Sequence, residues 1–205
     1  MSEEKRVQGA RDIALDALMQ VERANAWSDE GLRRGITRGG LDSRDAALAA
    51  RIAYGVMQNR MLLDFYIGCW CSQKVARLEP VIRNILRVGA YQILFLDKIP
   101  VSAAVNEAVE QTKIYANKRA AGLVNGSLRA LARQKDTLAA PQDLATKYSH
   151  PQPLVDCLRA SMDEETLEAF LAADNDIPKT ALQCNPLIAA PEHLELRDET
   201  GKVVW

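Results

Sequence analysis

Apolar residues recur at the spacing of an α-helix through the first 140 residues of the chain, and no segment there alternates between apolar and polar side chains. The segment Pro80–Leu96 is apolar on nearly every side, which is typical of a helix surrounded by its neighbours. We therefore expect an all-α bundle built around this segment. The same spacing predicts further helices at 7–23, 28–38, 101–112 and 121–131, and one long helix or two nearly collinear ones at 48–70.

Three residues of the central segment are unusual within an apolar helix. Gly89 costs about 1 kcal/mol relative to alanine inside a helix, so its presence predicts that another helix backbone approaches closely there. Arg83 and Arg87 lie four residues apart on one face of the same helix. Because a buried guanidinium needs a partner, we expect each to pair with an acidic residue or with the carbonyl groups of a neighbouring helix end.

The composition changes at Pro141. Six of the eight prolines lie from that residue onward, and one further helix is predicted by the capping pattern Ser161-x-x-Glu164. Short strand-like pieces follow in His193–Trp205. We therefore expect two regions, an all-helical domain over residues 1–140 and a short mixed α/β connector over residues 141–205.

Charge is divided between the same two regions. Residues 1–140 hold 21 Lys and Arg against 15 Asp and Glu, whereas residues 141–205 hold 5 against 12. Fifteen of the 21 cations are arginines, which suit phosphate recognition, so the first region is a candidate for anionic partners such as RNA. We predict that the RNA-binding residues are the basic ones around the first two helices: Lys5, Arg6, Arg11, Arg33, Arg34 and Arg38.

Two alternatives to this basic face stay open. A second set of cations lies in the last helix of the bundle, and RNA could lie there instead: Lys118, Arg119, Arg129 and Arg133. The other alternative is that each basic cluster is only the solvated face of a helix.

No catalytic or metal-binding motif stands out. The chain contains no glycine-rich phosphate loop, no G-x-S-x-G and no H-E-x-x-H. Four cysteines and two histidines do not have the spacing of a zinc site, and His150 and His193 are interpreted as surface or turn residues. No apolar run reaches the ~18 residues that span a bilayer. We therefore expect no catalytic residue, no metal and no membrane contact in this chain, and a cytoplasmic location.

Three adjoining stretches resemble a known domain. These are LEPVIRNILRVGAYQILFLDKIP, VSAAVNEAVEQTK and AGLVNGSLRAL, and Arg11-x-x-Ala14 and Tyr54-Gly55-Val56 also fit the pattern. Together they resemble the NusB-like helical domain, and most closely the N-terminal region of the ribosomal RNA small-subunit methyltransferase B family (RsmB, Sun or Fmu). In the tail, Tyr148-x-His150-Pro151 and Ala172-Ala173-Asp174-Asn175, with Pro178 and Asn185, resemble the connector of that family.

This resemblance implies an RNA-recognition region in front of a cytosine-C5 methyltransferase domain. Ribosomal RNA would be the main partner, with a ribosomal protein or a methyltransferase domain as a further one. The family uses S-adenosylmethionine, but its glycine loop and two catalytic cysteines have no counterpart before Trp205. We therefore expect no cofactor and no methyl transfer in this chain alone. Two other functions stay open: a NusB-type antitermination adaptor that holds RNA and a ribosomal protein, and a helical protein-interaction scaffold without RNA.

Overall fold

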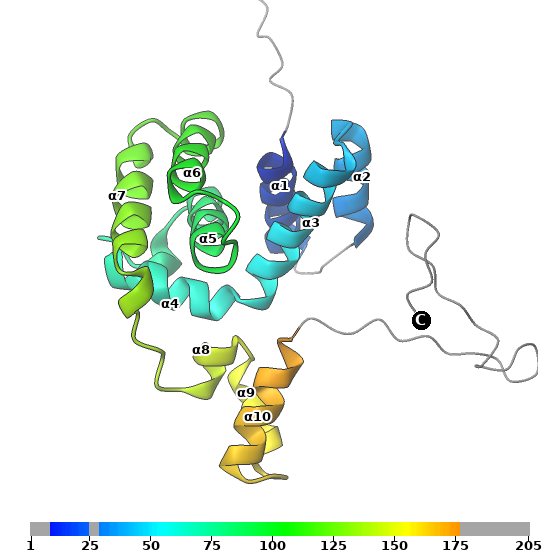
Figure 1. Ribbon diagram of the computed structural model, residues 1–205, viewed down its shortest axis with the longest axis vertical. Helices are drawn as coiled ribbons and strands as arrows, with labels where there is room; N and C mark the ends of the chain where they lie inside the picture. Colours follow the sequence, from blue (N-terminus) through cyan, green and yellow to red (C-terminus); the bar gives the residue numbers. More distant parts are fainter. Residues whose placement is uncertain (1–8, 25–28, 177–205) are drawn as a thin grey trace, which may run out of the picture. The chain divides into compact units, whose positions relative to one another are not determined.

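The computed structural model describes residues 9–24 and 29–176, and every regular element in those ranges is helical. The expected all-α bundle is therefore confirmed, and Figure 1 shows how its helices are arranged. Two single 3₁₀ turns, Val75–Arg77 and Lys135–Thr137, join larger elements. The bundle helices are α1 (Ala10–Ala24), α2 (Asp29–Gly39), α3 (Ser43–Gln58), α4 (Arg60–Trp70), α5 (Pro80–Phe95), α6 (Val101–Tyr115) and α7 (Ala120–Arg133).

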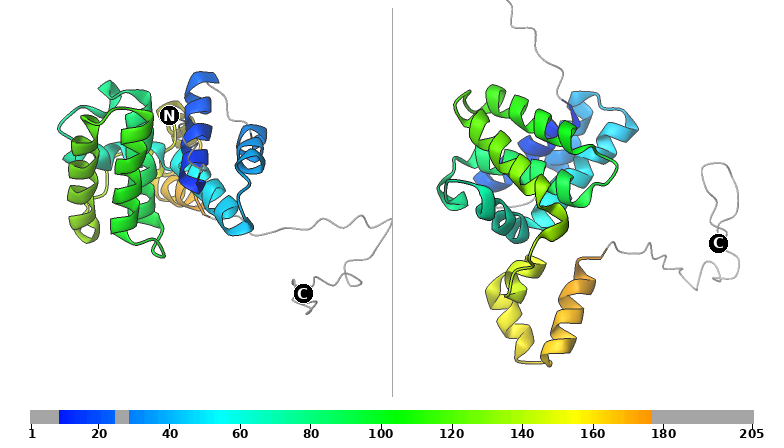
Figure 2. Two further views of the ribbon diagram at one scale, coloured as in Figure 1. Left: turned by 90° about the horizontal axis from the view of Figure 1, so that it is seen from above. Right: turned by 60° about the vertical axis from the view of Figure 1, so that its left-hand side comes forward.

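Helix α5 lies at the centre of the bundle, as the sequence predicts. Nearly all of its residues from Ile82 to Ile93 are buried, and α1, α3, α4, α6 and α7 all pack against it. The close approach expected at Gly89 is real, although a side chain makes it instead of a backbone. A Cβ at Gly89 would stand 2.5 Å from Cδ1 of Leu128 on α7. Helix α6, in green in Figure 2, and α7, in yellow-green, run side by side and both pack against α5.

An ion-pair cluster joins α5 to α1 and α4. The guanidinium of Arg87 donates to both carboxylate oxygens of Asp64 at 2.7 Å and to Glu22 at 2.9 Å. Arg83 also donates to Glu22, at 3.1 Å, and Asn84 accepts a hydrogen bond from Arg87. The side chain of Arg87 is only 7% exposed. The prediction that Arg83 and Arg87 pair with acidic residues is therefore confirmed.

The apolar stripe over residues 48–70 forms two helices that run in different directions, so the expectation of one helix or two collinear ones is wrong (Figure 1). The break falls at Asn59. Its side-chain amide donates to the carbonyl oxygen of Gly55 at 2.9 Å, and its backbone N–H bonds to the same oxygen. Both bonds close the end of α3, and α4 begins at the next residue.

The described part of the connector contains three helices instead of the one that we expect from the sequence: α8 (Leu144–Tyr148), α9 (Gln152–Arg159) and α10 (Glu164–Asp174). We call these three the connector lobe. Aspartate caps open two of them, because Asp143 accepts from the N–H of Thr146 and Asp163 from the N–H of Thr166. The cap of α10 is thus Asp163, not Ser161. The strand-like pieces in His193–Trp205 lie outside the described residues.

The connector lobe has a small core of its own and is attached where α3 meets α4. Its buried apolar side chains are Ala145, Val155, Leu167 and Leu171. Ser149, in the left-handed conformation at φ 57°, accepts from the backbone N–H of Leu62 through its hydroxyl, and Gln58 donates to the carbonyl oxygen of Asn175. The domain boundary that we place after residue 140 stays a prediction.

His150 lies between α8 and α9 and is buried, so of the two interpretations from the sequence, a surface or a turn residue, the surface one is wrong. Its two ring nitrogens lie 2.8 Å from the carbonyl oxygen of Tyr148 and 2.9 Å from a carboxylate oxygen of Asp174. Asn175 also donates to that carbonyl group. The side chain therefore ties the end of α8 to the end of α10.

Acid is expected to unfold the connector lobe before the bundle. The N–H of Thr146 lowers the pKa of Asp143, the N–H of Thr166 lowers the pKa of Asp163, and a hydrogen bond from Lys147 lowers the pKa of Glu168. These groups stabilise the lobe fully above their unfolded-state pKa of about 4, and that contribution is lost as the pH falls through their lower folded-state values. Amide hydrogen exchange across this range would report the loss of protection helix by helix.

The matched control for acid unfolding is the double substitution Asp143→Asn and Asp163→Asn. Asparagine keeps the oxygen that accepts at the helix cap but does not titrate in this range. The variant should retain the lobe at neutral pH and show a weaker dependence on acid. Loss of protection in α5 before α10 would contradict the prediction.

No helix among the described residues is both long and apolar enough to cross a membrane.

Candidate nucleic-acid interface

The predicted basic residues fall into three groups in the structure. Lys5 and Arg6 lie outside the described residues. Arg33, Arg34 and Arg38 have exposed side chains on α2, and Arg34 pairs with Glu30 one turn away, at 3.3 Å. Arg11 lies in the first turn of α1 and is half-buried.

The orientation of Arg11 is set from the core of the bundle. Its Nε donates to Oε1 of Gln92 at 2.6 Å, and Gln92 is buried and also donates to the carbonyl oxygen of Val88 within α5. This bond uses one edge of the guanidinium and leaves its other nitrogen donors for a second partner. Arg11 is thus held in place by a buried side chain.

The structure brings Arg11 together with three cations that are not among the RNA-binding residues predicted from the sequence. Arg44 and Arg51 on α3 and Lys98 in the α5–α6 turn line a groove with Arg11, and the groove has a volume of about 780 Å³. Arg44, Arg51 and Lys98 are all exposed. We call this hollow the basic groove. The spacing of seven residues between Arg44 and Arg51, two helical turns on one face, is the signal that could have indicated them.

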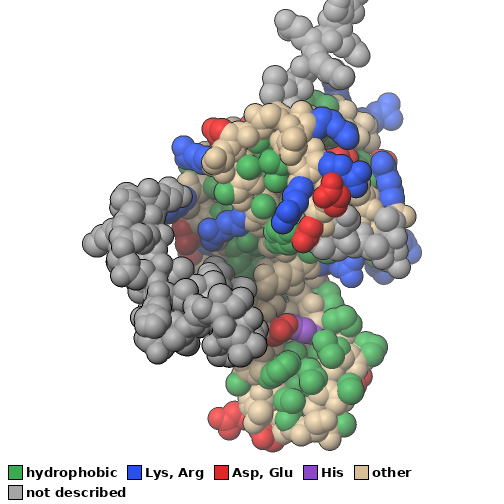
Figure 3. Space-filling view, turned by 90° about the vertical axis from the view of Figure 1, so that its right-hand side faces the viewer, with side chains coloured by type: hydrophobic (Ala, Val, Ile, Leu, Met, Phe, Trp, Pro, Cys, Tyr) green, Lys and Arg blue, Asp and Glu red, His purple; other side chains and the backbone are tan. Residues whose placement is uncertain are grey.

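Three aspartates also line the basic groove, and two of them are engaged elsewhere. Asp42 caps α3 by accepting from the N–H of Asp45 at 2.7 Å, while Asp97 pairs with Lys135 at 3.2 Å. Figure 3 draws the molecule from the side of α2 and α3, with Lys and Arg scattered over the bundle among carboxylates. On that face the connector lobe presents acidic and apolar side chains. The cations visible on this face therefore belong to the bundle.

One aromatic ring opens on the basic groove. Phe95, the last residue of α5, is 37% exposed and lines the groove. Its ring stacks on that of Tyr91 with the ring centres 5.2 Å apart and 22° between the planes. The groove thus combines four cations and three aspartates with an accessible aromatic ring. Cations beside an aromatic ring are the combination found in sites for single-stranded nucleic acids.

The second basic set, on α7, does not form one site. Lys118 and Arg119 precede its first residue, whereas Arg129 and Arg133 lie in its last turns, so they are separated by most of a helix about 20 Å long. Arg129 also donates to Asn125 one turn earlier in the same helix. None of the four lines the basic groove.

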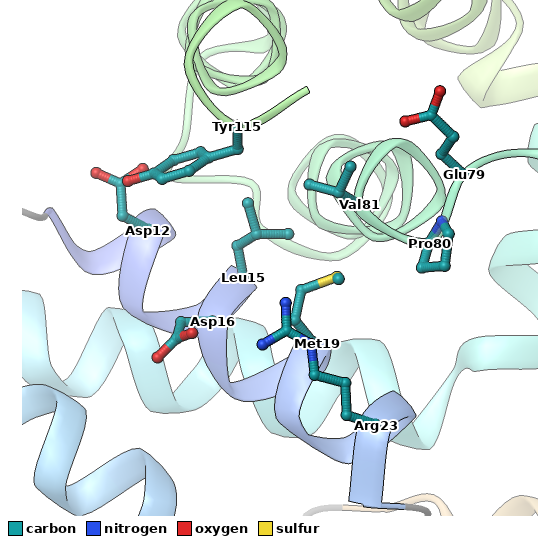
Figure 4. Close-up of a pocket in the computed structure, with 9 residues that line it drawn as sticks. All are labelled: Asp12, Leu15, Asp16, Met19, Arg23, Glu79, Pro80, Val81 and Tyr115. Carbon is teal, nitrogen blue, oxygen red and sulfur yellow. The ribbon is translucent and has the colours of Figure 1, made fainter. Parts of the chain in front are cut away.

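A second hollow, of about 380 Å³, has the opposite character. It lies between α1, the start of α5 and the end of α6, and Figure 4 shows its lining residues. Three carboxylates, those of Asp12, Asp16 and Glu79, line it against one guanidinium, that of Arg23, and Leu15, Met19 and Val81 supply apolar side chains. A phosphate chain would be repelled by these carboxylates, so this hollow suits a different kind of partner.

A family model described as "NusB family" matches residues 8–133 of this chain. The chain belongs to the NusB family. The matched residues include all seven helices of the bundle and therefore every cation of the basic groove.

Two curated relatives of this NusB-family chain show different coverage. A probable ribosomal RNA small subunit methyltransferase B of Bacillus subtilis is 34% identical over 194 residues, which are 92% of this chain and 43% of the relative. The transcription antitermination protein NusB of Bacillus licheniformis is 35% identical over 121 residues, 58% of this chain and 90% of that protein. The NusB-family chain thus spans less than half the length of the methyltransferase.

A solved structure shares the fold of the bundle. It contains the antitermination factors NusB and NusE in complex with double-stranded RNA, and its matching chain is 24% identical with a TM-score of 0.56. The match covers 61% of this chain and 94% of that one. This likeness establishes the fold of the bundle.

Proposed function

We propose that this protein binds RNA in the basic groove and is the RNA-recognition region of a ribosomal RNA small-subunit methyltransferase. The observation that carries the proposal is the convergence of Arg11, Arg44, Arg51 and Lys98 from three separate elements on one groove. Cations that neutralise phosphates supply most of the affinity for RNA, independently of sequence. The relative that was solved with double-stranded RNA has the same fold, which supports this class of partner.

The connector lobe favours the methyltransferase over the antitermination adaptor. The alignment with the Bacillus subtilis methyltransferase covers 92% of the chain, whereas the one with the Bacillus licheniformis NusB covers 58%. The bundle alone accounts for the shorter match. Three helices with their own core, two of them capped by aspartates, are additional structure that a NusB-type adaptor of that length does not need. Methyl transfer from S-adenosylmethionine to a cytosine would then depend on sequence outside these 205 residues.

The salt dependence of RNA binding tests the basic groove. Replacing both Arg44 and Arg51 with glutamine should reduce the slope of log affinity against log salt by ~1.4 for a single-stranded ribosomal RNA fragment, since each lost phosphate contact contributes ~0.7. Fluorescence anisotropy at several KCl concentrations would measure the slope. The affinity should fall nearly equally for unrelated RNA sequences, because phosphate contacts carry no base information.

Two matched variants complete this test. The pair Arg33→Gln and Arg34→Gln asks whether α2 contributes, as the sequence predicts, and the pair Arg119→Gln and Arg133→Gln asks the same of α7. The α7 pair should leave the slope unchanged. If that pair lowers the slope while the groove pair does not, the RNA lies on α7 and the proposed site is wrong.

A second candidate function, the adaptor that also holds a ribosomal protein, is favoured by the acidic hollow of Figure 4. Its apolar side chains and the carboxylates of Asp16 and Glu79 are complementary to a basic protein segment with an apolar residue. Replacing Glu79 with lysine should then abolish co-elution with a basic ribosomal protein and leave RNA affinity intact. Absence of any such complex with the unmodified protein would exclude this second function.

A further inference from the structure

Phe95 differs from the other exposed aromatic residues of the bundle. Exposure alone decides nothing, because Phe65 on α4 is equally exposed, at 38%, and single apolar residues at a surface are common. Phe65 meets Tyr66 edge-on, at 66° between the ring planes. Phe95 instead lies nearly parallel to Tyr91 and opens on a groove lined by four cations.

The ring of Phe95 is held in position from below. Tyr91 is only 7% exposed, and its phenol fills the space that a side chain at position 55 would take. A Cβ on Gly55 would stand 2.0 Å from Cζ of Tyr91. Tyr91 is therefore fixed by α3, and Phe95 rests on a support that cannot easily move. A preorganised ring loses little conformational entropy when a ligand stacks on it.

The arrangement of charge around this ring matches one form of RNA. Cations can follow the phosphates of a strand while an aromatic ring takes the face of a base, and such stacking accepts any base because every base has a π-face. In a duplex the bases are stacked inside, and the major groove of A-form RNA is too deep and narrow for side chains to reach them. An exposed phenyl ring among cations is therefore suited to an unpaired base.

We infer that Phe95 stacks on an unpaired base of the RNA held in the basic groove and so makes this site select single-stranded over double-stranded RNA. This inference rests on the proposed function, since it assigns a role within the same groove. Arg11 lines the same groove and is held by Gln92, which lies one residue after Tyr91 on α5. One segment of α5 thus positions both a phosphate-binding group and the stacking ring.

The test compares Phe95→Leu with Phe65→Leu. Leucine keeps an apolar side chain of similar size but has no ring, so Phe95→Leu should lower the affinity for a single-stranded RNA about tenfold, from stacking contributions that span about 5- to 150-fold per base. Affinity for a duplex of the same length and the salt slope should both stay unchanged. Phe65→Leu, which removes an equally exposed ring outside the groove, should change neither. Circular dichroism melts of the two variants check that both fold.

A second measurement reports the stacking without depending on a ring deletion. Single-stranded RNA that carries 2-aminopurine should lose fluorescence on binding to the unmodified protein and to Phe95→Trp, which keeps an aromatic ring, and should keep it with Phe95→Leu. If quenching is the same for all three proteins, or if Phe95→Leu weakens single strands and duplexes equally, the inference is wrong. A lower salt slope with Arg44→Gln and Arg51→Gln would still support RNA binding in that case, whereas an unchanged slope would remove the proposed function itself.

Discussion

Replacing Arg87 with methionine is expected to destabilise the bundle by about 3 kcal/mol, at the lower end of the cost of breaking a buried ion pair. Methionine fills much of the same volume but leaves Asp64 without its two hydrogen bonds and Glu22 with Arg83 alone. These carboxylates are 31% and 20% exposed, so water offsets part of the loss. Urea denaturation followed by circular dichroism would measure the change.

Two further variants separate the buried pair from a surface pair. Arg34→Met breaks the exposed ion pair with Glu30 and should change stability by less than about 0.5 kcal/mol. The double variant Arg87→Met and Asp64→Leu should recover part of the lost stability, because it removes the unpaired carboxylate as well. A single Arg87→Met protein as stable as the unmodified one would show that the cluster contributes nothing to folding.

Replacing Gly55 with alanine is expected to cost about 3 kcal/mol, at the upper end of overpacking in a core. The new methyl group would stand 2.0 Å from Cζ and 2.1 Å from the hydroxyl oxygen of Tyr91, so the buried ring must move. That ring supports Phe95, and the substitution should therefore also weaken binding of single-stranded RNA in the basic groove. A thermal melt would measure the first effect, and anisotropy the second.

Gly126 provides the matched control for this substitution. It also lies inside a helix, α7, but a Cβ there would meet nothing within 4 Å. Gly126→Ala should therefore raise stability by about 1 kcal/mol, because alanine is the better helix former. Equal effects of the two substitutions would mean that helix propensity, not the close approach of Tyr91, decides the outcome at position 55.

The sequence predicts the centre of this fold well, because the residues of α5 are themselves apolar on most sides of the helix. A helix that is apolar on most sides has no face for solvent, so other helices must surround it. Two arginines within such a helix require acidic partners. The bend at Asn59 is not predictable in this way. The apolar stripe continues on both sides of Asn59. The hydrogen bonds to Gly55 that end α3 do not change the helical spacing of the apolar residues.

The basic groove could be predicted only in part, for a reason of geometry. Arg11 is found by its place in a basic cluster along the chain, but its neighbours in space, Arg51 and Lys98, come from other elements. Their proximity depends on how α1, α3 and the α5–α6 turn pack. The sequence does not distinguish Phe95 from the other apolar residues of α5. Only the packing of the bundle shows that the last turn of α5 is exposed while the earlier turns are buried.

The partners of α1 have a consequence for how the protein is made on the ribosome. Arg11 bonds to a residue 81 positions later, Asp12 to Gln111, 99 positions later, and Glu22 to Arg83, 61 positions later. At about 5–20 residues per second, the helix would wait roughly 5–20 s for the last of these partners to be synthesised. Until α5 is synthesised, only α2 and α3, of the helices that pack closely against α1, can cover its apolar face. The N-terminal half of the bundle should therefore emerge as an incomplete intermediate, and a nascent chain stalled before α5 would be a natural substrate for chaperones.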